Sequence, residues 1–106
     1  MIAVTDEELQ IILEIINNSL DNCKVIAFGS RVKLTHRNNS DLDLAFIKSD
    51  NAKLSLNEES LLKESFSKSD LPFFVDIRDY NAVSSAFREI INKNYEIIYD
   101  RRSVLK

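Results

Sequence analysis

The sequence predicts a small α/β (α+β) domain in which helices pack on one face of a small mixed sheet. Short apolar segments suited to strands alternate along the chain with amphipathic segments of helical period. In two places a Ser or Thr is followed three positions later by Glu, the spacing of a capping box at the start of a helix. One glycine and one proline in 106 residues exclude a linker-rich or repetitive chain, so residues 1–106 are interpreted as a single domain.

Three segments have the apolar spacing of amphipathic helices. The first two begin at capping-box residues, and Pro72 follows the end of the second. The expected helices cover residues 5–19, 55–68 and 81–92.

Short apolar runs between these helices predict four strands. The polar stretch 31–39 separates the first two of them and is expected to form a short helical turn followed by a loop. The expected strands cover residues 24–28, 41–47, 73–77 and 95–99.

Composition excludes several classes of function. The net charge of −3 argues against a general nucleic-acid binder, because such a protein needs a basic face to displace counterions. No apolar run approaches the roughly 20 residues that span a bilayer. No signal peptide is recognisable and the single cysteine, Cys23, cannot form an internal disulfide, so we expect a cytoplasmic protein without membrane contact or direct nucleic-acid binding.

The pattern that points to chemistry is Gly29-Ser30, ten residues, then Asp41-Leu42-Asp43. If the strands that end at Gly29 and begin at Asp41 are antiparallel neighbours, these ends lie side by side. Asp41 and Asp43 share one face of a strand, where two carboxylates repel each other unless a proton or a cation lies between them. Mg²⁺ is the expected cation. Gly29 permits a positive φ or a close approach, and Ser30 offers a hydroxyl and N–H groups to a phosphate.

A third acid, Asp76, lies in an otherwise apolar strand, where an ionised side chain is costly unless it is paired or bound to a metal. Beside the Asp41 strand it would complete three carboxylates suited to two-metal phosphoryl chemistry, with Asp76 as the candidate general base. Two structural alternatives stand next to this interpretation. Asp76 could pair with Arg78, and Asp41 with Asp43 could form a strand-entry turn.

Together these residues resemble the minimal nucleotidyltransferase domains of the DNA polymerase β-like superfamily, over about residues 5–100. In that family, small stand-alone members are antitoxins of HEPN-type ribonuclease toxins. The resemblance implies a nucleotidyltransferase-like fold and an enzyme that transfers AMP from ATP to a tyrosine of the HEPN partner, in a complex with it, and so neutralises the toxin.

The resemblance also implies residue roles. Gly29 and Ser30 would bind the triphosphate and Arg31 a phosphate, and Asp41, Asp43 and Asp76 would be the catalytic carboxylates and the ligands of Mg²⁺, with two ions expected. The sequence departs from the family pattern after Arg31, where Val32-Lys33-Leu34-Thr35 replaces the usual glycine and basic residues. The residues that could supply the missing nucleotide contacts are Lys33, His36 and Arg37.

Two other functions fit the same pattern. The chain could be a non-catalytic antitoxin that neutralises its toxin by occlusion, or the catalytic subunit of a small-substrate nucleotidyltransferase. A partner is expected to dock on apolar residues of the last two elements, namely Phe87, Ile91, Tyr95 and Tyr99.

Overall fold

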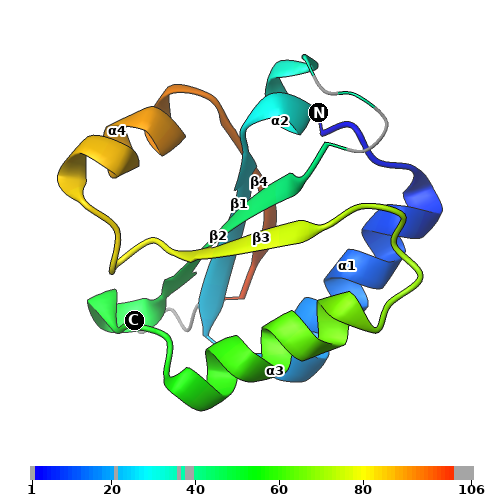
Figure 1. Cartoon of the computed structure of the whole chain (residues 1–106). Helices are drawn as coiled ribbons and strands as arrows, with labels where there is room; N and C mark the ends of the chain where they lie inside the picture. Colours follow the sequence, from blue (N-terminus) through cyan, green and yellow to red (C-terminus); the bar gives the residue numbers. More distant parts are fainter. Residues whose placement is uncertain (1, 21, 36, 38–39, 102–106) are drawn as a thin grey trace.

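The protein folds as a four-stranded sheet with helices on both faces (Figure 1). The structure is a computed structural model that describes residues 2–20, 22–35, 37 and 40–101. The elements in chain order are α1 (Asp6–Ser19), β1 (Cys23–Phe28), α2 (Ser30–Lys33), β2 (Leu42–Lys48), a 3₁₀ turn (Ser49–Asn51), α3 (Leu56–Ser67), β3 (Val75–Asp79), α4 (Ser85–Lys93) and β4 (Tyr95–Asp100). No helix within these ranges is both long enough and apolar enough to cross a membrane.

Every helix and strand expected from the sequence is present, and the boundaries differ by more than one residue in only two of them. The α4 helix begins later than expected because Ser84 is its N-cap and accepts a hydrogen bond from the Phe87 N–H. The β3 strand begins and ends two residues later than its apolar run, since its last residues pair with β2 through the backbone.

The sheet has the strand order β3-β2-β1-β4. The β1 strand is antiparallel to β2 and β4, as expected for β1 and β2, and β3 runs parallel to β2. In this register Phe28 lies opposite Asp43, and Asp43 lies opposite Asp76. Residues directly opposite each other share a face, so the two acids lie next to each other, beside the end of β1.

The two faces of the sheet carry separate cores. The α1 and α3 helices pack on one face, where they bury apolar residues of β1, β2 and β3. The α4 helix packs on the other face, where Ile91 contacts Ile26, Phe28 and Ala45. The expectation of helices on one face alone is therefore wrong. Since both faces of the central strands are apolar, the second face also needs a covering helix.

The expectation that a partner docks on Phe87, Ile91, Tyr95 and Tyr99 is also wrong for most of these residues, because α4 packs on the sheet. Ile91 is 0% exposed, and the Phe87 ring packs edge-on against Phe28 at 5.9 Å between centroids. Tyr99 is half-buried and donates a hydrogen bond to Asn17. Of the expected set only Tyr95 is among the exposed large apolar residues, which on α4 and β4 are Ile90, Tyr95 and Ile97.

The capping box at Ser55 gives the first testable prediction. The Ser55 hydroxyl accepts a hydrogen bond from the Glu58 N–H at 3.0 Å, so Ser55→Ala removes an N-cap and should lower the free energy of unfolding by about 1 kcal/mol. Urea denaturation measures this loss. The same change inside the helix, Ser60→Ala, should be neutral or slightly stabilising because alanine has the higher helix propensity; equal losses would contradict the capping role.

Candidate active site

Gly29 lies at the point where β1 turns into α2. Its φ of 83° and ψ of −157° fall in a region that is essentially restricted to glycine. A Cβ atom at this position would also collide with the Asp43 carboxylate on the neighbouring strand. The sequence predicted that Gly29 provides either a positive φ or a close approach, and the structure requires both.

Ser30 follows Gly29 and begins α2, whose Val32 and Lys33 N–H groups donate to the Gly29 carbonyl. Two N–H groups of this short helix are therefore already paired, and the Ser30 hydroxyl and backbone N–H are the groups that a phosphate oxygen at this position would meet. Ser30 is half-buried and adjoins the glycine that contacts Asp43. Gly29 thus brings the start of α2, which carries Ser30, next to the Asp43 carboxylate at the end of β1.

The three acids predicted from the sequence come from two neighbouring strands. Asp43 lies on β2, Asp76 lies opposite it on β3, and Asp41 immediately precedes β2. The pKa of Asp43 is raised from 3.8 to about 6, mainly by burial and then by the negative charges of Asp76 and Asp41, while Arg78 lowers it. The site thus concentrates negative charge that a proton or a cation would relieve.

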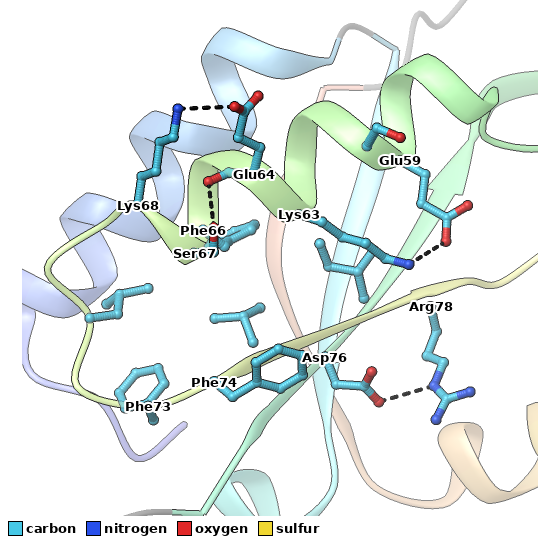
Figure 2. A pocket seen from close by; sticks show the side chains of 14 residues that line it. Glu59, Lys63, Glu64, Phe66, Ser67, Lys68, Phe73, Phe74, Asp76 and Arg78 are labelled. Atoms are coloured by element: carbon cyan, nitrogen blue, oxygen red, sulfur yellow. Dashed lines mark hydrogen bonds and ion pairs between the residues drawn. The ribbon is translucent and has the colours of Figure 1, made fainter.

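The third carboxylate has a partner within the protein. The Arg78 guanidinium donates to the Asp76 carboxylate at 3.1 Å (Figure 2). It also lies 5.3 Å from the centre of the Phe87 ring. The pairing that the sequence offered as an alternative for Asp76 is therefore present. Across the described ranges no three acidic, histidine or cysteine side chains are clustered closely enough to hold a metal ion.

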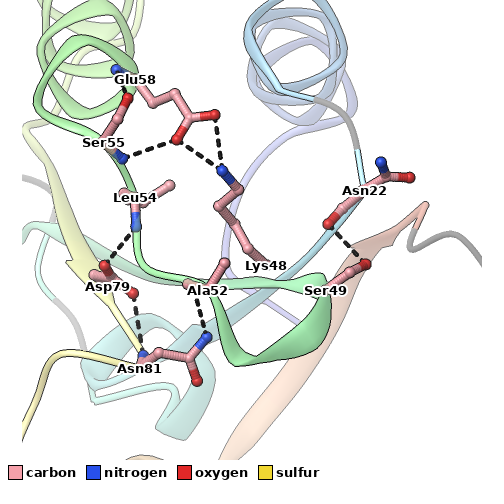
Figure 3. A network of polar contacts seen from close by, with 9 residues as sticks. All are labelled: Asn22, Lys48, Ser49, Ala52, Leu54, Ser55, Glu58, Asp79 and Asn81. Carbon is pink, nitrogen blue, oxygen red and sulfur yellow. Dashed lines mark hydrogen bonds and ion pairs between the residues drawn. The ribbon is translucent and has the colours of Figure 1, made fainter.

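The next acid on β3, Asp79, has a different environment. Its carboxylate accepts hydrogen bonds from the Leu54 N–H at 2.7 Å and the Asn81 N–H at 3.1 Å (Figure 3). Close by, Glu58 accepts from Lys48 at 3.0 Å, and its pKa is lowered by the Ser55 N–H and by Lys48. Asp79 thus stabilises the segment before α3, and of the two acids of β3 only Asp76 faces the candidate site.

Arg31 turns away from the candidate phosphate position. Its side chain, only 5% exposed, donates to the Ala3 carbonyl at 2.7 Å and to the Ser40 carbonyl at 3.0 Å. The guanidinium also lies 4.1 Å from the centre of the Phe73 ring. These contacts link the N-terminal segment, the residue before Asp41 and the segment before β3. The predicted contact of Arg31 with a phosphate stays a prediction that this geometry does not favour.

The structure describes two of the three further basic residues that were expected near the nucleotide. Lys33 and Arg37 are exposed, and His36 lies outside the described residues. The Arg37 N–H donates to the Ser40 hydroxyl, which orders the chain just before Asp41. Sequence reasoning missed Ala3 and Phe73 as supports of this loop, since nothing in their local sequence indicates a partner so far along the chain.

Residues 10–103 match the family described as Polymerase beta, Nucleotidyltransferase. The chain therefore belongs to this nucleotidyltransferase family, as the motif predicted. It is 41% identical over 103 residues to the "Probable protein adenylyltransferase MntA" of Haemophilus influenzae. The matched region covers 97% of this chain and 89% of that relative.

Solved structures show the same fold. A chain in the crystal structure of a toxin–antitoxin with AMP-PNP matches with a TM-score of 0.73 at 20% identity. The match covers 87% of this chain and 73% of that chain. A chain in the complex of tri-AMPylated Shewanella oneidensis HEPN toxin with MNT antitoxin has a TM-score of 0.67 at 17% identity, with 89% and 71% covered. The nucleotidyltransferase-like fold is thus confirmed.

The charge at Asp43 leads to a prediction about stability and pH. Because its pKa is higher in the folded chain than the ordinary value of 3.8, the folded state binds more protons between about pH 4 and 6 and loses stability as the pH rises through that range. Asp43→Asn removes this cost. After a discount for solvent screening, the substitution should raise the free energy of unfolding at pH 7.5 by on the order of 1 kcal/mol, which corresponds to a rise of roughly 4–8 °C in Tm.

Differential scanning calorimetry of both proteins at pH 7.5 and pH 3.5 tests this prediction. The gain in Tm should disappear at pH 3.5, where the Asp43 carboxyl is protonated in the folded and the unfolded chain. The change Asp70→Asn at an exposed position serves as the control. A loss of Tm at pH 7.5 in the Asp43→Asn variant would show that Asp43 is not under repulsion.

The contacts of Arg31 give a second prediction for this site. Arg31→Met keeps much of the side-chain volume but leaves the carbonyls of Ala3 and Ser40 without their donor, which should lower the free energy of unfolding by about 2 kcal/mol. Lys33→Met at the neighbouring exposed position should change it little. Urea denaturation measures both. Unchanged stability together with weaker ATP binding would instead assign Arg31 to the nucleotide.

Proposed function

We propose that this chain is an antitoxin-type protein adenylyltransferase. It transfers AMP from ATP to a tyrosine hydroxyl of a partner HEPN ribonuclease toxin, with which it forms a complex, and so neutralises the toxin in the cytoplasm. The observation that carries the proposal is the Asp43 carboxylate packed on Gly29, between Asp41 and Asp76, in a chain of the nucleotidyltransferase family. The names of its relatives, a protein adenylyltransferase and toxin–antitoxin complexes, support the choice of acceptor.

The acids fit a magnesium ion. Asp41 and Asp43 would hold it, since Mg²⁺ is usually bound by one or two carboxylates together with substrate phosphates, and the excess negative charge at Asp43 would be relieved. When bound, the ion neutralises phosphate charge and lowers the pKa of a coordinated hydroxyl. A second ion would require the Asp76 carboxylate, and Arg78 would then have to release it.

The residues of the chain account for the remaining parts of the reaction. Ser30 and the first turn of α2 bind the triphosphate of ATP beside Gly29. The tyrosine oxygen attacks the α-phosphorus, a new oxygen–phosphorus bond forms, the bond to the β-phosphate oxygen breaks, and pyrophosphate leaves. The Asp76 carboxylate takes the phenolic proton. Most of the rate enhancement comes from positioning and charge stabilisation.

A second candidate function is neutralisation by binding alone. The exposed apolar side chains Ile90, Tyr95 and Ile97 on α4 and β4 favour it, because they offer a partner a surface that needs no catalysis. A small-substrate nucleotidyltransferase completed by a second subunit is the remaining alternative. In all three cases the charge of the chain is against direct nucleic-acid binding.

Transfer of label from ATP labelled at the α-phosphate onto the HEPN partner tests the proposal, with Mg²⁺ present. The Asp41→Asn/Asp43→Asn variant should lose at least about 100-fold in rate, because the charge stabilisation supplied through these ligands is worth several kcal/mol. Asp70→Asn, the same chemical change at an exposed position, should transfer normally.

Two results would contradict the proposal. A stable complex with no label on the partner would favour binding alone, especially if the double variant still neutralised the toxin. Label on a small molecule in place of the protein would favour the small-substrate enzyme.

A further inference from the structure

A groove of about 1180 Å³ runs between α3 and the outer edge of β3 (Figure 2). The β3 strand is the last strand on its side of the sheet, so nothing in the sheet covers that edge. Asp76, the proposed general base, is among the residues that line the groove. A group bound in the groove therefore lies beside Asp76.

Phe74 is the exposed aromatic residue of this groove. Its side chain is 65% exposed, whereas Val75 and Ile77 on the opposite face of the strand are buried. The Phe74 carbonyl accepts a hydrogen bond from the Leu42 N–H at 2.9 Å, which fixes the backbone beside β2. Phe74 immediately precedes β3 and lies two positions before Asp76, a separation of about 6.6 to 6.8 Å where the backbone is extended.

The charges around the groove indicate what kind of ligand it takes. Its acidic and basic side chains pair with one another within 3.1 Å, as Lys63–Glu59, Lys68–Glu64 and Arg78–Asp76. These three pairs leave no excess of positive charge for a phosphate chain or a nucleic acid. An uncharged ligand with an aromatic ring matches both the balanced charge and the exposed phenyl ring.

We propose that the groove receives the acceptor segment of the partner protein and that Phe74 packs against the acceptor tyrosine. This inference rests on the proposed function and names the surface that selects its acceptor. Aromatic rings pair with centroids about 4.5 to 7 Å apart, and Asp76 lies two positions further along the chain, so a tyrosine ring on Phe74 is close enough for its hydroxyl to reach the Asp76 carboxylate. Phe74 is then a specificity-determining residue that contacts the substrate.

Steady-state AMP transfer onto the HEPN partner tests the inference in the full chain. Phe74→Ala should raise the KM for the partner about tenfold, the loss expected for one aromatic pair and its buried area. Phe74→Leu should behave in the same way, and Phe74→Tyr should stay near the unchanged protein because it keeps the ring. Leu56→Ala, at a side chain that is 84% exposed and outside the groove, is the matched control.

Binding of AMP-PNP by calorimetry separates the possible outcomes, and it should be unchanged in all four variants. Weaker AMP-PNP binding by Phe74→Ala would place the nucleotide base on Phe74 and overturn the inference. An unchanged KM for the partner would also overturn it while the proposed function stands. No transfer by the unsubstituted chain would instead contradict the proposed function, and the inference with it.

Discussion

The close contact between Gly29 and the Asp43 carboxylate determines the geometry of the site. It exists because β1 and β2 are antiparallel, which places the end of one strand against the start of the other. Any side chain at position 29 would occupy the space of the carboxylate, and the local backbone conformation also excludes one. The first turn of α2, the loop before Asp41 and the position of the acids all follow from this contact.

Negative charge is concentrated at this contact by the parallel pairing of β2 with β3. That pairing brings Asp76 opposite Asp43, and the resulting repulsion adds to the cost of burial at Asp43. Arg78 compensates part of the charge from the exposed side of β3. The two acids of the site differ in access as a result: Asp43 lies on an inner strand against the glycine, and Asp76 lies on the edge strand beside the open groove.

The helices cover the two faces of the sheet to different extents. The α1 and α3 helices cover one face completely at its centre, and residues such as Ile12, Phe46 and Leu62 are inaccessible to solvent there. The α4 helix covers only the apolar part of the other face, so Asp41 remains exposed and Asp43 is only half-buried at the start of β2. Arg31 stabilises the chain next to these acids by donating to the carbonyls of Ala3 and Ser40, which are far apart in the sequence.

The sequence by itself determined the elements, the family and the residues of the motif, because each depends on local periodicity or on a fixed spacing such as that from Gly29 to Asp41. The neighbours of β2 were only conditions of the sequence argument, and the structure shows them to be β1 and β3. Only the tertiary structure decided where α4 packs, that Arg31 is buried, and that Phe74 lies exposed beside Asp76. Arg31 and Phe74 carry no local signal of their environment. Their roles depend on contacts with Ala3, Ser40 and the α3 helix, which become neighbours only when the sheet forms.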